Sequence, residues 1–104
     1  MEFYIKPRLY LVNQKFWPLC DELNEQSLSE LQDIIDSCED VMSNGDVQEL
    51  YWGWHVSSLK MKKETTTLSY NSQTEIEIPT IEIYNMLKAY RNKLNEYENE
   101  SPIS

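Results

Sequence analysis

The sequence is poor in the residue types on which many catalytic sites depend. Its 104 residues include one histidine, His55, and two glycines, Gly45 and Gly53. Two separate glycines exclude a glycine-rich phosphate-binding loop, and His55 has no second group at the spacing of a nucleophilic triad. Acid–base catalysis by two carboxylates needs burial to separate their pKa values, and the carboxylates here are expected on an exposed helix face. We therefore expect a protein that is not an enzyme and that binds no cofactor.

Cysteine and long apolar runs are also scarce. Cys20 and Cys38 are far apart and match no zinc-ligand spacing. Lys6, Pro7 and Arg8 interrupt the N-terminal stretch, so it has no apolar run of signal-peptide length. No later run approaches the roughly 20 apolar residues of a membrane span. The chain is thus expected in the cytoplasm, where reduced thiols are favoured over a disulfide.

Basic residues are absent from a long part of the chain, because no Lys or Arg occurs between Lys15 and Lys60. This segment carries ten acids, and the rest of the chain has eight acids and nine bases, so the segment accounts for the net charge of −9. Such a negative field repels nucleic acid and anionic membranes and attracts basic partners. Solubility is the simpler explanation, and composition alone leaves it open. The ten acids are Asp21, Glu22, Glu25, Glu30, Asp33, Asp36, Glu39, Asp40, Asp46 and Glu49.

The order of sequence patterns predicts a single α+β domain over residues 1–98, with a frayed tail at 99–104. Residues 3–12 are rich in strand formers, and Pro7 restricts them to an edge strand or two short strands. A short helix or turn is expected around Pro18. Strands at 50–57, 65–70 and 74–78 have short connections, which predicts a three-stranded antiparallel meander packed against two main helices.

The first main helix has the clearest boundary signals. Ser27 and Glu30 form an S-x-x-E capping box, in which each side chain can satisfy a backbone N–H at the start of a helix. Asn44 and Gly45 supply the C-terminal stop. Apolar residues recur between these boundaries at helical spacing, and Cys38 falls on their face, where we expect it to be buried and inert.

The opposite face of this helix is acidic. Asp33, Asp36 and Asp40 project away from the apolar stripe, with Glu30 and Glu39 on the two flanks. Carboxylates are good ligands for hard cations, but calcium sites use loops that wrap around the ion. Because a straight helix cannot do this, we predict an acidic surface and no metal site.

An aromatic stretch follows the helix. In residues 50–57, Leu50, Trp52, Trp54 and Val56 alternate onto one face of a predicted strand, and His55 falls on the other. The tryptophans would belong either to the core, where aromatic side chains dominate small proteins, or to a surface that binds a partner. The position of the strand between two amphipathic helices favours the core.

The C-terminal third, TEIEIPTIEIYNMLKAYRNKLNEYE, resembles the ending of small bacterial immunity proteins of contact-dependent inhibition and related polymorphic toxin systems. The shared pattern is a short strand with alternating apolar residues, a helix start at Pro-Thr, where Thr80 is the expected N-cap, and a last amphipathic helix. It is a pattern of core residues, so it identifies no toxin-contacting position. The residues that carry it are Ile76, Ile78, Pro79, Thr80, Ile83, Leu87, Tyr90 and Arg91.

The resemblance implies an immunity protein that binds and neutralises a cognate toxin domain. Charge favours a basic nuclease, with an RNase first, whose active site the acidic surface would cover. The alternative is a nucleic-acid-mimicking phage or plasmid antagonist of a host nuclease or restriction enzyme, or an acidic regulatory subunit. The sequence leaves the oligomeric state open. The residues expected to bind the partner are Glu30, Asp33, Asp36, Glu39, Asp40, Asp46, Glu49 and Tyr51.

Overall fold

The structure, a computed structural model, describes residues 1–6, 8–54, 56–71 and 74–100. The expectation for His55 therefore lies outside the described residues, as do positions 101–104 of the tail that we expected to fray. The described chain has α+β architecture, which confirms the predicted fold class. Its elements are β1 (Phe3–Ile5), β2 (Leu9–Leu11), the 3-10 turn η1 (Gln14–Phe16), α1 (Trp17–Asn24), α2 (Leu28–Ser43), β3 (Leu50–Gly53), β4 (Ser57–Met61), β5 (Thr65–Tyr70), β6 (Thr74–Pro79) and α3 (Thr80–Glu100).

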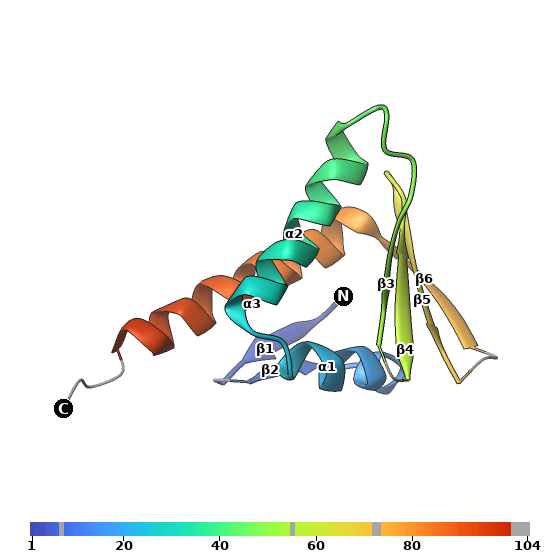
Figure 1. The fold of residues 1–104 in the computed structure, drawn as a ribbon. Helices are drawn as coiled ribbons and strands as arrows, with labels where there is room; N and C mark the ends of the chain where they lie inside the picture. Colours follow the sequence, from blue (N-terminus) through green and yellow to red (C-terminus); the bar gives the residue numbers. More distant parts are fainter. Residues whose placement is uncertain (7, 55, 72–73, 101–104) are drawn as a thin grey trace.

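The molecule is built in two layers with a small third part below them. Strands β3, β4, β5 and β6 form an antiparallel sheet in that order, and α2 and α3 cover one of its faces (Figure 1). The hairpin of β1 and β2 forms a separate two-stranded sheet, and it lies with α1 beneath the helices (Figure 1). The C-terminal part of α3 extends past α2, away from the sheet (Figure 1). In the described residues, no helix combines the length and the apolar character needed to cross a membrane.

Helix α2 begins and ends as its sequence predicts. The Ser27 hydroxyl oxygen accepts a hydrogen bond from the Glu30 backbone N–H at 3.1 Å and donates to the Glu30 carboxylate at 3.0 Å. At the other end, Asn44 N–H donates to the carbonyl of Asp40 at 2.9 Å. The apolar stripe enters the core, where Leu31, Ile34, Ile35, Cys38 and Val41 are buried.

The sheet has one strand more than the sequence suggested. The expected single strand over residues 50–57 is two strands, because Trp54 N–H donates to the Ser57 carbonyl at 2.9 Å and closes a tight turn. Val56, expected on the core face, is instead 55% exposed. The next turn, between β4 and β5, is closed by a hydrogen bond from Lys62 N–H to the Thr65 carbonyl at 3.0 Å.

The register of the four strands separates a core face from an open face. On the core face, Trp52 pairs with Leu59, Leu59 with Leu68, and Leu68 with Ile76. On the open face, the corresponding row is Tyr51, Lys60, Thr67 and Glu77, and it carries no helix (Figure 1). The sheet therefore presents a polar surface on the side opposite α2 and α3.

The start of α3 differs from the expected cap. Thr80 is the first residue of α3, but its hydroxyl donates to the Lys62 carbonyl at 2.6 Å and lies 2.9 Å from the Thr66 hydroxyl. Thr80 N–H donates to the Glu64 carbonyl at 3.0 Å. The side chain thus fastens the helix start to the β4–β5 turn.

The N-terminal hairpin is attached to α1 by a side chain that completes its edge. The Asn24 side chain accepts from the Leu9 N–H and donates to the Leu9 carbonyl, both at 2.9 Å. Tyr90 of α3 donates to the same Asn24 oxygen at 3.0 Å. Asn24 therefore joins the hairpin, α1 and α3 at one point.

Candidate protein-interaction surface

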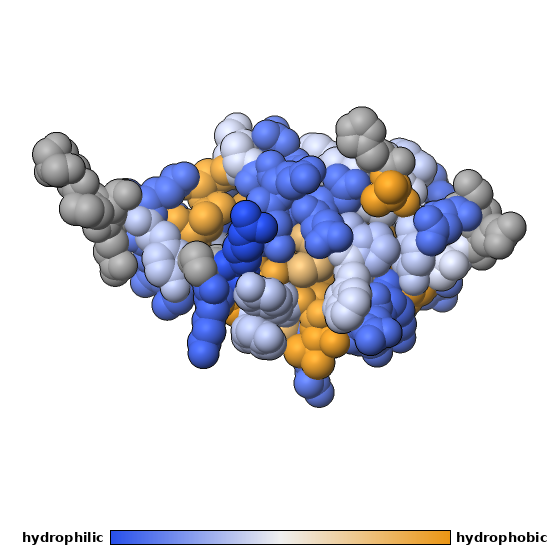
Figure 2. All heavy atoms as spheres, turned by 90° about the horizontal axis from the view of Figure 1, so that it is seen from below, coloured by the Kyte–Doolittle hydropathy of each residue, from blue (hydrophilic) through white to orange (hydrophobic). Residues whose placement is uncertain are grey.

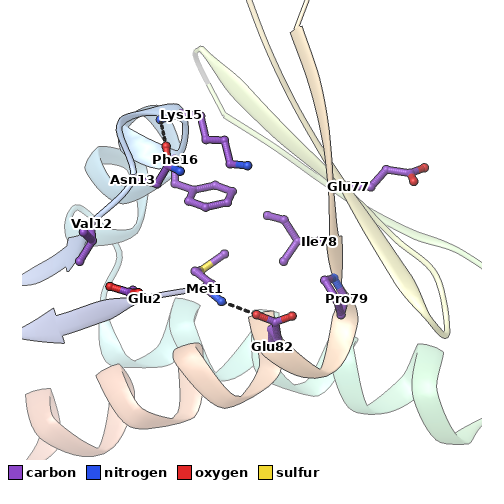
Figure 3. Close-up of a pocket in the computed structure, with 10 residues that line it drawn as sticks. All are labelled: Met1, Glu2, Val12, Asn13, Lys15, Phe16, Glu77, Ile78, Pro79 and Glu82. Atoms are coloured by element: carbon purple, nitrogen blue, oxygen red, sulfur yellow. Dashed lines mark hydrogen bonds and ion pairs between the residues drawn. The ribbon is translucent and has the colours of Figure 1, made fainter.

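One cleft of the described chain lies beside the N-terminus. A cleft of about 400 Å³ lies between the hairpin, η1 and the end of β6, and Figure 3 shows Met1, Phe16 and Ile78 converging on it. The Met1 amino group forms an ion pair with Glu82, while Glu77 points away from the cleft (Figure 3). Glu2, Asn13 and Lys15 also line the cleft, but among the described residues no Ser, Thr, Cys or His side chain lines it, so it offers no hydroxyl or thiol nucleophile beside a base.

Metal-binding chemistry is not assembled in the described residues either. No group of three or more His, Cys, Asp or Glu side chains there has the geometry to hold an ion. Cys20 and Cys38 are both free and buried. Burial raises the pKa of both thiols, that of Cys38 to about 12, so each stays protonated and unreactive near neutral pH.

The outer face of α2 carries three exposed aspartates. Asp33, Asp36 and Asp40 are all exposed, as the helical periodicity predicts. The two ion pairs found among the described residues join Met1 to Glu82 and Lys93 to Glu96, so neither neutralises this face. Like charges three and four residues apart on a helix repel one another. The three carboxylates are thus held on a rigid support without a cation from the described chain.

The flanking acids differ in how free they are. Glu30 is exposed but is engaged in the capping box with Ser27. Glu39 accepts a hydrogen bond from the Tyr84 hydroxyl at 2.6 Å, which turns it toward α3. Glu30 and Glu39 therefore lie beside the acidic face, but each of their carboxylates already forms a hydrogen bond within the chain.

The loop after α2 continues the negative surface. Asn44 fixes this loop, because its side chain accepts from the Asp46 N–H and its carbonyl accepts from the Val47 N–H, both at 3.0 Å. Asp46 and Glu49 are exposed, on either side of the half-buried Val47. Tyr51 follows on β3 and is 64% exposed, the largest exposure of any described hydrophobic residue of its size.

One acid of the basic-free segment does not belong to this surface. Glu22 is only 6% exposed, and its carboxylate accepts from the Val56 N–H at 3.4 Å. It therefore links α1 to the segment after β3 instead of adding to the exposed field. Local sequence patterns could not predict this contact, because the two residues are 34 positions apart.

The tryptophans of the aromatic stretch lie at the margin of the core. Trp52 and Trp54 are half-buried and pack against the buried cluster. The Trp52 indole N–H donates to the Ser37 hydroxyl of α2 at 3.0 Å. Trp52 is thereby part of the contact between sheet and helix, as the core interpretation expects, and Ser37 is a contact residue that the sequence analysis missed.

A second surface, made by the hairpin and α1, was also missed. Tyr4 and Tyr10 stack with their ring centroids 5.1 Å apart, and both are exposed, as are Val12 and Trp17. Figure 2, which views the molecule from below, shows hydrophobic side chains near the middle and toward both sides, separated by hydrophilic ones. The signal in the sequence was the alternation of aromatic and basic residues within the first seventeen positions.

Comparisons with protein-family models, with curated proteins and with solved structures each find no match for this chain.

Proposed function

We propose that the chain is an immunity protein, which binds a basic toxin domain in the cytoplasm and neutralises it by covering its active site. One observation carries this proposal. Exposed carboxylates lie along the outer face of α2 and in the following loop, and neither ion pair among the described residues involves any of them, although Lys62 and Lys63 line a cleft beside this loop. Negative charge held on a rigid helix favours encounter with a basic partner.

The chemistry of nucleases makes them the favoured class of toxin, with an RNase first. A nuclease binds phosphates through basic side chains, so its active-site groove attracts a row of carboxylates. Asp33, Asp36 and Asp40 are the central contacts in this proposal, and Asp46, Glu49 and Tyr51 extend them toward β3. Binding would be stoichiometric, because the inhibitor covers the groove and performs no reaction itself.

A rescue experiment tests the proposal. The C-terminal domain encoded immediately upstream of this chain is expressed alone and together with it, and surviving cells are counted. We expect death when the domain is expressed alone and survival when both are present. Absence of toxicity, or toxicity without rescue, would overturn the assignment to an immunity pair and favour an antagonist of a host nuclease, which needs no neighbouring toxin gene.

A further inference from the structure

Strand β3 has an outer side that pairs with no other described strand. The sheet order places Leu50–Gly53 at one edge. Because Trp54 N–H donates to the Ser57 carbonyl, the alternation of an antiparallel ladder directs the backbone groups of Tyr51 and Gly53 outward. Within the part of the chain that the structure describes, no loop or side chain is hydrogen-bonded to these outward groups. An edge of this kind can accept a further strand.

The opposite edge of the sheet, strand β6, is protected against pairing with a further strand, unlike β3. The bond from Lys62 N–H to the Thr65 carbonyl sets the alternation on the other side, and it directs the backbone of Glu75, Glu77 and Pro79 outward on β6. A proline has no N–H to offer, and charged side chains at an edge oppose pairing with another chain. Strand β3 contains no proline and no lysine, and its pairing with β4 is regular, so none of these features protects its edge.

The surroundings of the β3 edge are acidic on the side of α2, while Lys60 of β4 lies beside Tyr51 on the open face of the sheet. Ser37, which accepts the Trp52 hydrogen bond, shows where α2 meets this strand. On the surface of α2, Ser37 lies between Asp33, four residues before it, and Asp40, three residues after it. Exposed Glu49 directly precedes the strand. An added strand would therefore lie beside carboxylates contributed by the helix and by the loop.

We propose that the β3 edge binds a β-strand of the partner protein, and that this strand carries basic side chains. The inference rests on the proposed function and names the element through which the toxin domain docks. Main-chain hydrogen bonds to Tyr51 and Gly53 supply the pairing, and the flanking carboxylates select lysine or arginine on the incoming strand. The exposed Tyr51 ring provides a contact of large area, and its Cε1 atom lies 3.4 Å from the position that a Cβ on Gly53 would take.

A second copy of this chain does not fit the same edge. Antiparallel pairing of two β3 strands would place two acidic α2 faces on the same side of one continuous sheet. With a net charge of −9 on each copy, this arrangement is opposed by repulsion. The charge thus selects a heterologous, basic strand.

Amide hydrogen exchange tests the inference, with the upstream-encoded domain as the probe. When the wild-type chain binds that domain, we expect exchange at Tyr51 and Gly53 to slow at least tenfold, and exchange at Glu75 and Glu77 on the other edge to stay unchanged. Binding and rescue without protection at Tyr51 and Gly53 would overturn the edge inference and leave the proposed function standing. Absence of both binding and rescue would overturn the two together.

Paired proline variants give a second test. Tyr51→Pro removes one outward N–H without touching the ladder to β4, and Glu77→Pro does the same at the β6 edge. We expect Tyr51→Pro to weaken binding at least tenfold, Tyr51→Thr, which keeps the N–H, to weaken it less, and Glu77→Pro to have the smallest effect. Equal loss in the two proline variants would contradict the inference. If Tyr51→Pro does not fold, as judged by circular dichroism, the exchange experiment decides.

Discussion

The indole N–H of Trp52 donates to the Ser37 hydroxyl at 3.0 Å, and this bond joins the edge strand β3 to α2. The same hydroxyl donates to the backbone carbonyl of Asp33 at 3.0 Å. Ser37→Ala is expected to lower the free energy of unfolding by about 1 kcal/mol, because it removes the acceptor of a half-buried indole. Urea unfolding of the wild type and the variant measures the difference.

A double-mutant cycle separates this bond from the packing of the indole ring. The cycle combines Ser37→Ala with Trp52→Phe, which keeps a ring in place and removes the donor. We expect the two changes together to cost less than the sum of the single changes, since either one already removes the same hydrogen bond. Strict additivity would show that the bond contributes nothing to stability.

The hydroxyl of Thr80 is predicted to stabilise the junction between the sheet and α3. Thr80 and Thr66 are both completely buried, and the Thr66 hydroxyl donates to Thr80, whose own hydroxyl donates to the Lys62 carbonyl. Thr80→Val keeps the shape but leaves the buried Thr66 hydroxyl without its acceptor, which costs about 1–3 kcal/mol, and removes the donor to the part-buried Lys62 carbonyl. Thr80→Ser keeps the hydroxyl and should be milder. Equal midpoints of urea unfolding for the two variants would contradict this role.

The parts of the fold that local sequence determines were predicted well. The boundaries of α2 follow from Ser27, Glu30 and Asn44, whose bonds all lie within the helix and its caps. The apolar stripe fixes which face enters the core, so exposure of Asp33, Asp36 and Asp40 could be predicted by periodicity alone. Short-range signals are sufficient here because each contact joins residues at most four positions apart.

The predicted strand boundaries are wrong where one local sequence pattern fits two different structures. The alternation from Leu50 to Val56 continues unbroken through the turn, and no Asn-Gly or Asp-Gly pair marks the turn as it marks many hairpins. The bond between Trp54 and Ser57 forms only when β4 pairs with β3, so the sequence pattern could not separate one long strand from two short ones.

The candidate surface was predictable in its charge but not in its details. Glu22 is buried against the segment after β3, and Glu39 bonds to Tyr84, which is 45 positions away. Such contacts depend on how α1 and α3 pack, which periodicity does not determine. The open edge of β3 depends in the same way on the order of strands in the sheet.

Cys38 predicts a loss of stability at alkaline pH. Burial raises its pKa from the ordinary 9.0 to about 12, with a smaller contribution from Glu39. Below pH 9 the thiol is protonated in both the folded and the unfolded chain, so it adds no pH dependence. Between pH 9 and 12 only the unfolded chain releases the proton, and the folded state loses stability as the pH rises.

Comparison with Cys38→Ala isolates this effect from the titration of other groups. The variant should be less stable than the wild type at pH 8, because it leaves a cavity in the core. The difference in free energy of unfolding is expected to shrink as the pH is raised toward 11, since only the wild type carries the thiol that titrates. A difference that stays constant over this range would contradict the buried, protonated thiol.

The acidic face of α2 is predicted to control the rate of partner binding. Asp33→Asn, Asp36→Asn and Asp40→Asn together should slow association about tenfold at low salt, since steering by charge accelerates encounter by 10-fold or more. The dependence of the rate on salt should weaken as well. Thermal stability should rise slightly, because the three carboxylates repel one another along the helix. Stopped-flow mixing with the upstream-encoded domain measures the rate.

A control variant with the same net charge shows whether the association rate depends on the α2 face itself or only on total charge. It replaces three exposed acids outside the basic-free segment with glutamine, and its charge equals that of the triple variant of α2. If the α2 face makes the contact, this control should associate nearly as fast as the wild type. Equal slowing in both variants would mean that only total charge matters. The three control positions are Glu2, Glu75 and Glu77.

Glu39 and Asp40 are adjacent on α2, and their variants should affect partner binding and stability in opposite ways. Glu39 is held by the Tyr84 hydroxyl at 2.6 Å, whereas Asp40 is exposed on the outer arc of the helix. Asp40→Asn should therefore weaken partner binding more than Glu39→Gln, and Glu39→Gln should instead lower the free energy of unfolding by up to about 1 kcal/mol, because a carboxylate accepts a stronger hydrogen bond than an amide. Calorimetric titration and urea unfolding of the two variants measure both quantities. The reverse order in binding would move the interface from the outer arc to the seam between α2 and α3.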